Sequence, residues 1–182
     1  MGERHLGKAV RASTPRRPAG AYAADTAEDN SEEHLMSTRK VSRSVTVAAE
    51  PEEIFELLAH PSGHAVLDGS GTVKGGLAPD DERLSLGARF GMRMRMGLPY
   101  RITNEVVEFE EGRRIAWRHF GGHIWRWELA PVEGGTKVTE TFDWGAAKAP
   151  PALELARIPE RNTASIEQTL SNIAARFGRV DD

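Results

Sequence analysis

Two polar side chains, His119 and Glu140, stand out because each lies within a run of alternating apolar residues. In a β-strand, alternate residues share a face. The alternation that turns Trp117 inward therefore also turns His119 inward, and Glu140 shares the inward face with Phe142 for the same reason. A buried carboxylate needs partners. An imidazole and a carboxylate that approach one another inside a protein could bind a hydroxyl or carbonyl group, or act as general base and acid in an aldol-type cyclisation or dehydration. The alternative is that bulges at the strand ends turn both groups to solvent.

A second set of residue types, His64, Asp68 and Ser70, could supply a Ser/His/Asp triad by composition alone. The spacing argues against it, since nothing resembles the strand-turn-helix of a nucleophile elbow. Gly69 and Gly71 instead predict a turn into the next strand.

A metal site is not expected. His60 and His64 are four residues apart, but Pro61 and Gly63 oppose the helix that would align them, and no third ligand is evident. The chain has no cysteine, which excludes disulfides, zinc ribbons and thiolate nucleophiles. It also has no Gly-rich phosphate or dinucleotide motif, so no cofactor is expected.

Length and composition limit the kind of protein that positions these groups. The 182 residues are 39% hydrophobic and 28% charged, which is typical of one globular domain. The formal net charge of -3 gives no general attraction to nucleic acid. No apolar run is long enough for a membrane span, and no secretory signal is evident. We therefore expect a cytoplasmic protein with no nucleic-acid partner and no integral membrane association.

The composition changes near Met36. Residues 1–36 are poor in large apolar side chains and show no sustained periodicity, which predicts a disordered tail before a domain over residues 37–182. Met36 immediately precedes the first strand, so an alternative is that translation begins there. Peptides from residues 11–33 in natural protein would exclude that alternative.

The periodicity then predicts an α+β order of elements. A strand over residues 41–47 precedes a short helix that begins at Pro51 and ends before Pro61. The alternation is clearest from Leu84 to Met96, with Leu86 on the apolar face. Further strands are expected over residues 100–109, 114–120, 123–130 and 136–144, and a long helix ends before Gly178. A curved antiparallel sheet must bury its apolar face on that last helix.

The inward faces of these elements predict an apolar wall. Methionine adapts to irregular partners, and all four Trp lie within residues 117–144, which suits a planar or polycyclic ligand. The alternative is that these side chains fill the core against the terminal helix. The candidate ligand-binding residues are Phe90, Met92, Met94, Met96, Trp117, Trp125, Trp127, Phe142, Ile166 and Leu170.

Several segments, in order, resemble the START-like SRPBCC superfamily of polyketide cyclases/dehydrases and lipid-transport proteins. They are SRSVTVAAEPEEIFELLAHP, LDGSGTV, LSLGARFGMRMRMG, NEVVEFEEGRRIAWRH and GGTKVTETFDW, followed by the C-terminal helix, and together they span residues 37–177. The resemblance implies a helix-grip fold, in which the sheet wraps the last helix around a cavity for a hydrophobic or amphipathic molecule. Relatives often have Trp where this chain has Leu67, which weakens the match at the cavity entrance.

Three functions fit this resemblance, because fold alone does not select a reaction. The leading hypothesis is a non-catalytic carrier of a hydrophobic small molecule. The second is a polyketide cyclase or dehydratase that uses His119 and Glu140. The third is a chaperone-associated protein-interaction module that uses an outer stripe of Arg89, Arg93 and Arg95. The alternative is that this stripe is a solvated face, with Glu105, Glu108 and Glu128 available for cross-strand charge pairing. The oligomeric state stays open.

Overall fold

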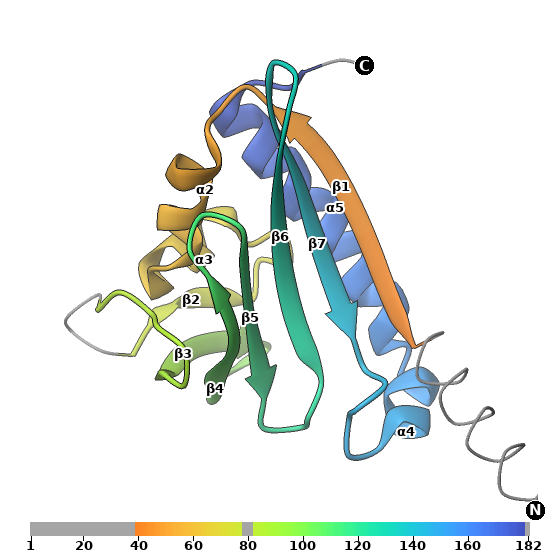
Figure 1. Cartoon of the computed structure of the whole chain (residues 1–182). Coiled ribbons are helices and arrows are strands. Elements are labelled where there is room, and N and C mark those ends of the chain that lie inside the picture. Colours follow the sequence, from red (N-terminus) through yellow and green to blue (C-terminus); the bar gives the residue numbers. More distant parts are fainter. Residues whose placement is uncertain (1–38, 78–81, 181–182) are drawn as a thin grey trace, which may run out of the picture.

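Alternating polar and apolar residues build one antiparallel sheet of seven strands, in the order β1-β7-β6-β5-β4-β3-β2 (Figure 1). The computed structural model describes residues 39–77 and 82–180. Successive strands from β2 to β7 pair as neighbours, and β1 pairs with β7. The strands are β1 (Lys40–Val47), β2 (Val73–Gly76), β3 (Arg89–Met96), β4 (Leu98–Glu110), β5 (Arg114–His119), β6 (Ile124–Val132) and β7 (Gly135–Asp143).

The long helix α5 (Ile158–Phe177) packs on the inner face of this sheet. Figure 1 shows the sheet curving so that β1 and β7 lie along α5. Ile166, Leu170 and Ile173 are buried on one stripe of the helix, as the 3.6-residue period predicts. The expected α+β helix-grip architecture is confirmed. A short helix, α4 (Pro150–Leu155), precedes α5 and was not separated from it by the sequence pattern.

Two short helices, α2 (Pro51–Leu58) and α3 (Pro61–Leu67), follow β1. The prediction that Pro61 and Gly63 oppose a helix was wrong. Pro61 occupies the first turn of α3, where its missing N–H is not needed. Gly63 lets α3 pack closely on α2, because a Cβ at this position would lie 2.0 Å from the Leu57 carbonyl oxygen.

The segment before β3 also differs from the sequence prediction. The alternation from Leu84 suggested a strand, but β3 begins only at Arg89. The Ala88 N–H donates to the Ser85 carbonyl oxygen at 3.0 Å, which forms a turn instead. Leu86 is consequently 66% exposed and does not share the buried face.

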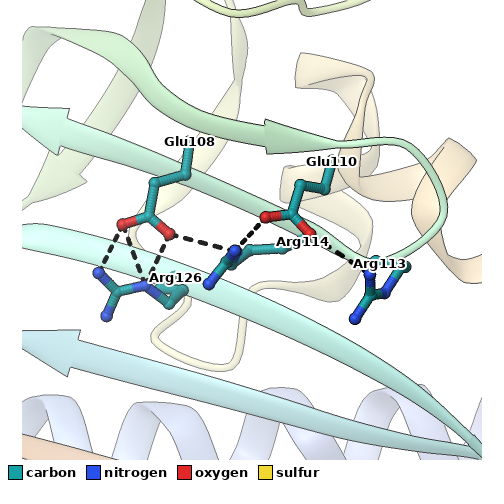
Figure 2. A network of polar contacts seen from close by, with 5 residues as sticks. All are labelled: Glu108, Glu110, Arg113, Arg114 and Arg126. Atoms are coloured by element: carbon teal, nitrogen blue, oxygen red, sulfur yellow. Dashed lines mark hydrogen bonds and ion pairs between the residues drawn. The ribbon is translucent and has the colours of Figure 1, made fainter.

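The outer face of the sheet carries a network of ion pairs (Figure 2). Arg126 donates through Nε and Nη2 to the Glu108 carboxylate at 2.6–3.2 Å, and Arg114 lies 3.6 Å from the same carboxylate and also contacts Glu110. Arg126 therefore belongs to the face opposite Glu140. The Arg126 guanidinium, through its hydrogen bonds, lowers the pKa of Glu108.

The stripe of Arg89, Arg93 and Arg95 is exposed on the outer side of β3. This agrees with the solvated face that the sequence offered as the alternative, although within residues 39–77 and 82–180 no ion pair joins these arginines to Glu105, Glu108 or Glu128. Glu108 instead pairs with Arg126, and Glu105 lies 3.9 Å from Arg118.

Three expectations concern residues at the N-terminus. The disordered tail over residues 1–36, the start at Met36 and the first residues of the domain lie outside the described residues, so they stay predictions. In the part of the chain that the structure describes, no helix is both long and apolar enough to cross a membrane.

Candidate functional site

A cavity of about 690 Å³ lies between the inner face of the sheet and helix α5. Strands β2 to β7 supply one wall, while the end of α2, α3, the loop after it, α4 and α5 supply the other. Tyr100 and Phe120 line the cavity and are also 40% and 67% exposed, so they mark where it meets solvent. The sequence did not single out either residue.

Three tryptophans and two methionines contribute to the apolar part of the lining, together with aliphatic side chains such as Leu58, Ile102 and Ile158. Trp117 stacks on the His64 ring at a centroid distance of 4.5 Å, and the His64 Nε2 lies 2.8 Å from the Leu58 carbonyl oxygen. These contacts fix the orientation of the Trp117 ring. The members of this lining that the sequence predicted are Met92, Met94, Trp117, Trp125 and Trp127.

Other predicted ligand contacts do not reach the cavity lining. Phe142 and Ile166 are completely buried, while Leu170 and Phe90 are 4% and 7% exposed. They form the hydrophobic core behind the lining, which is the packing alternative that the sequence left open. Met96 ends β3, and its side chain lies outside the described part of the structure.

Glu140 and Trp127 form a buried polar pair in the lining. They are directly opposite one another in the register of β7 and β6, on the same face, and are 5% and 4% exposed. Neither Trp127 Nε1 nor Glu140 Oε2 has a hydrogen-bond partner among the described residues. Burial, and secondarily the charge of Asp68, raises the pKa of Glu140 well above its ordinary value. Glu140 therefore favours its uncharged, proton-donating form.

His119 belongs to a second polar group, which it forms with His123. The two imidazoles stack at a centroid distance of 4.4 Å, and the Gly121 N–H donates to His119 Nδ1 at 3.2 Å. Burial lowers the pKa of His119. Burial, and secondarily the charge of His119, lowers the pKa of His123 to about 4. Both rings are therefore neutral near pH 7.

His119 and Glu140 are not brought together as a pair. Glu140 is opposite Trp127, which is in turn opposite Ile115, and His119 lies four residues further along β5. At about 3.3 Å per residue, that offset is about 13 Å along the strand direction alone. The structure thus supplies two separate polar groups, and no hydrogen bond or ion pair among the described residues joins them.

The loop between α3 and β2 closes the cavity against α5. The Asp68 carboxylate accepts the backbone N–H groups of Ser70 and Val73 at 3.0 and 2.9 Å, which confirms the predicted turn. The Gly69 N–H donates to Thr169 Oγ1 on α5 at 2.9 Å. A Cβ at Gly69 would lie 2.4 Å from the Ser165 carbonyl oxygen, so this close approach requires glycine.

The histidines four residues apart, His60 and His64, turn to different partners. His60 Nε2 lies 3.0 Å from a Glu56 oxygen, whereas His64 contacts a backbone carbonyl. In the described ranges, no group of three or more His, Asp or Glu side chains could hold a metal ion.

Comparison with known proteins relates this arrangement to a described family. Residues 38–178 match the family "Polyketide cyclase / dehydrase and lipid transport". The chain belongs to this family. An uncharacterized protein of Mycobacterium tuberculosis, Rv0088, is 40% identical over 146 residues, which cover 77% of this chain and 65% of the relative. The chain therefore spans somewhat less than two thirds of the curated relatives it matches.

Solved structures share the fold of this polyketide cyclase/dehydrase and lipid transport family member. Protein CV1439 from Chromobacterium violaceum superposes with a TM-score of 0.60 at 21% identity, covering 78% of this chain and 99% of the other. A protein from Arthrobacter aurescens gives a TM-score of 0.62 at 12% identity, with coverages of 77% and 88%. The resemblance seen in the sequence is confirmed for family and fold.

Membership in the family does not by itself identify the functional residues of this chain. Leu67, the residue that departs from the common pattern, is 2% exposed and lines the cavity. Sequence reasoning missed His123, Asn104 and Arg161 in the lining. His123 had a detectable signal, because the short Gly121–Gly122 turn brings it opposite His119.

Proposed function

We propose that this protein binds a hydrophobic or amphipathic small molecule in the cavity between the sheet and α5, and carries it without chemical change. The observation that carries the proposal is the cavity itself, about 690 Å³ with a largely apolar lining that includes three Trp and two Met side chains. Sites for small molecules typically measure about 300–1,000 Å³ and combine apolar walls with a few polar groups.

The chemistry of the lining supports an apolar ligand. Trp117, Trp125 and Trp127 offer broad flat surfaces, and Met92 and Met94 can adapt to an irregular outline. The family description names both catalysis and lipid transport. Carriage is favoured over catalysis because the two groups expected to form an acid/base pair, His119 and Glu140, lie in separate parts of the lining.

Mass spectrometry of natural protein tests the proposal. Protein purified natively from its own source is extracted with organic solvent, and we expect a lipid-like molecule in the extract. Met94→Arg places a cation in the apolar wall and should abolish this molecule, whereas Thr103→Arg, at an exposed position on β4, should retain it. Wild-type protein that repeatedly yields no such molecule, or equal yields from both variants, contradicts the proposal.

A cyclase or dehydratase is the second candidate, and the environment of Glu140 favours it. Burial raises the pKa of this carboxyl group and so favours its protonated form, which could act as a general acid toward a ligand in the cavity. Incubation of the extracted ligand or its precursor with wild-type protein and with Glu140→Gln tests this function. Turnover by wild type that Glu140→Gln abolishes would replace carriage with catalysis.

A further inference from the structure

Trp127 and Glu140 leave two polar atoms unsatisfied within an otherwise largely apolar wall. We propose that this pair is a recognition site for one uncharged oxygen, a hydroxyl or a carbonyl, on an otherwise apolar ligand. The inference rests on the proposed function and deepens it, because it specifies the chemistry of the ligand at its buried position.

The geometry shows a site that lacks a partner. Trp127 and Glu140 are cross-strand neighbours, so their side chains leave the same face of the sheet side by side. Trp127 Nε1 and Glu140 Oε2 are both buried, yet neither makes a hydrogen bond within residues 39–77 and 82–180. Buried polar groups are almost always satisfied. Trp144 follows that rule, since its Nε1 donates to Glu154 Oε1 at 3.0 Å.

The two side chains complement a neutral oxygen. A ligand hydroxyl can accept the Trp127 N–H and at the same time donate to a Glu140 oxygen. A ligand carbonyl can accept from Trp127 and from the O–H of Glu140, because burial raises the pKa of that carboxyl group and favours its protonated form. Either group satisfies both members of the pair.

Charged groups fit the same position poorly. An anion would face Glu140 and the negative charge of Asp68, which acts on Glu140 across the cavity lining. A cation could pair with Glu140 but has no lone pair to accept the Trp127 N–H, which would stay buried and unsatisfied. The pair therefore selects against both charges and in favour of a neutral acceptor.

A matched pair of probes tests the inference. Phenanthrene and 9-phenanthrol differ by one hydroxyl group, and their flat rings suit the Trp-rich wall. Binding is followed by quenching of the intrinsic Trp fluorescence near pH 7. We expect wild type to bind 9-phenanthrol about tenfold more tightly than phenanthrene, because one hydroxyl satisfies the buried pair.

Two variants and two controls locate the effect. Trp127→Phe and Glu140→Leu should each reduce the preference for the hydroxyl probe toward equal affinity, while phenanthrene still binds. Trp144→Phe removes an indole N–H that is not part of the cavity lining, and Glu128→Leu removes an exposed carboxylate of β6; both should keep the wild-type preference. Thermal unfolding of each variant confirms that it is folded.

The outcomes separate this inference from the proposed function. Equal affinities of the two probes for wild type, or a preference that survives both Trp127→Phe and Glu140→Leu, overturn the recognition site and leave the carrier proposal standing. If neither probe binds wild type at its solubility limit, the carrier proposal and the inference fall together.

Discussion

Acid should destabilise this protein through His123, and replacing that residue should remove the effect. The His123 ring is held in a largely buried stack with His119, 4.4 Å away, and lies 5.3 Å from the Phe142 ring. Its pKa falls from 6.5 to about 4 on folding, chiefly because burial disfavours the charged form. Below about pH 6.5, the unfolded chain therefore binds more protons than the folded chain, and stability decreases as the pH falls.

The size of the effect follows from the two pKa values. With 6.5 for the unfolded and about 4 for the folded state, linkage gives a loss of about 2 kcal/mol at pH 5, against about 0.2 kcal/mol at pH 7. Urea unfolding of wild type and His123→Phe, followed by Trp fluorescence over this pH range, measures the difference. Phe retains an aromatic ring in the stack but cannot titrate.

The expected result is a difference in slope, because other groups titrate in both proteins. Between pH 7 and pH 5, wild type should lose about 2 kcal/mol more than His123→Phe. Equal losses in the two proteins would refute the account of a buried, neutral His123. So would an NMR titration that places the pKa of His123 in the folded protein at or above 6.5.

Three further predictions concern stability and surface charge. Burial raises the pKa of Glu140, so above its ordinary value of 4.5 the folded state retains a proton that the unfolded state releases, and wild-type stability falls as the pH rises. Glu140→Gln should therefore gain stability relative to wild type in urea unfolding as the pH rises above about 4.5, and a constant difference would contradict the raised pKa. Gly69→Ala should cost about 1–3 kcal/mol in the same assay, because its Cβ would meet the backbone of α5, whereas Gly71→Ala has open space around its Cβ and tests backbone strain alone. Arg93→Glu reverses a charge on the outer face and should leave ligand affinity unchanged in a fluorescence titration, while a loss of affinity would connect that face to the cavity.

Much of the fold was predictable because the alternation along the strands reports which face is buried. Trp117, Trp127, Glu140 and Phe142 all lie on the inner face that their period-two pattern predicts. Alternation fails where a turn imitates it, as it does around Leu86. There, a hydrogen bond between backbone groups, and not the side-chain pattern, determines the conformation.

The site was harder to predict because alternation tells which face of the sheet a residue lies on, but not which residue of the neighbouring strand lies beside it. Pairing His119 with Glu140 assumed that two residues on the same face are close to one another. The register is set by the hairpin turns, and the two-residue turn at Glu133–Gly134 already places Glu140 opposite Trp127. The division between lining and core, as between Met92 and Ile166, depends on three-dimensional packing and not on the sequence pattern.

Labelled methionine methyl groups provide the most direct test of the central claim, that a ligand occupies the space between the sheet and α5. The chain has five methionines, of which Met92 and Met94 line the cavity. In a titration with 9-phenanthrol followed by NMR, we expect the methyl signals of Met92 and Met94 to shift together and saturate. Saturable binding that leaves both cavity signals unchanged would contradict the claim.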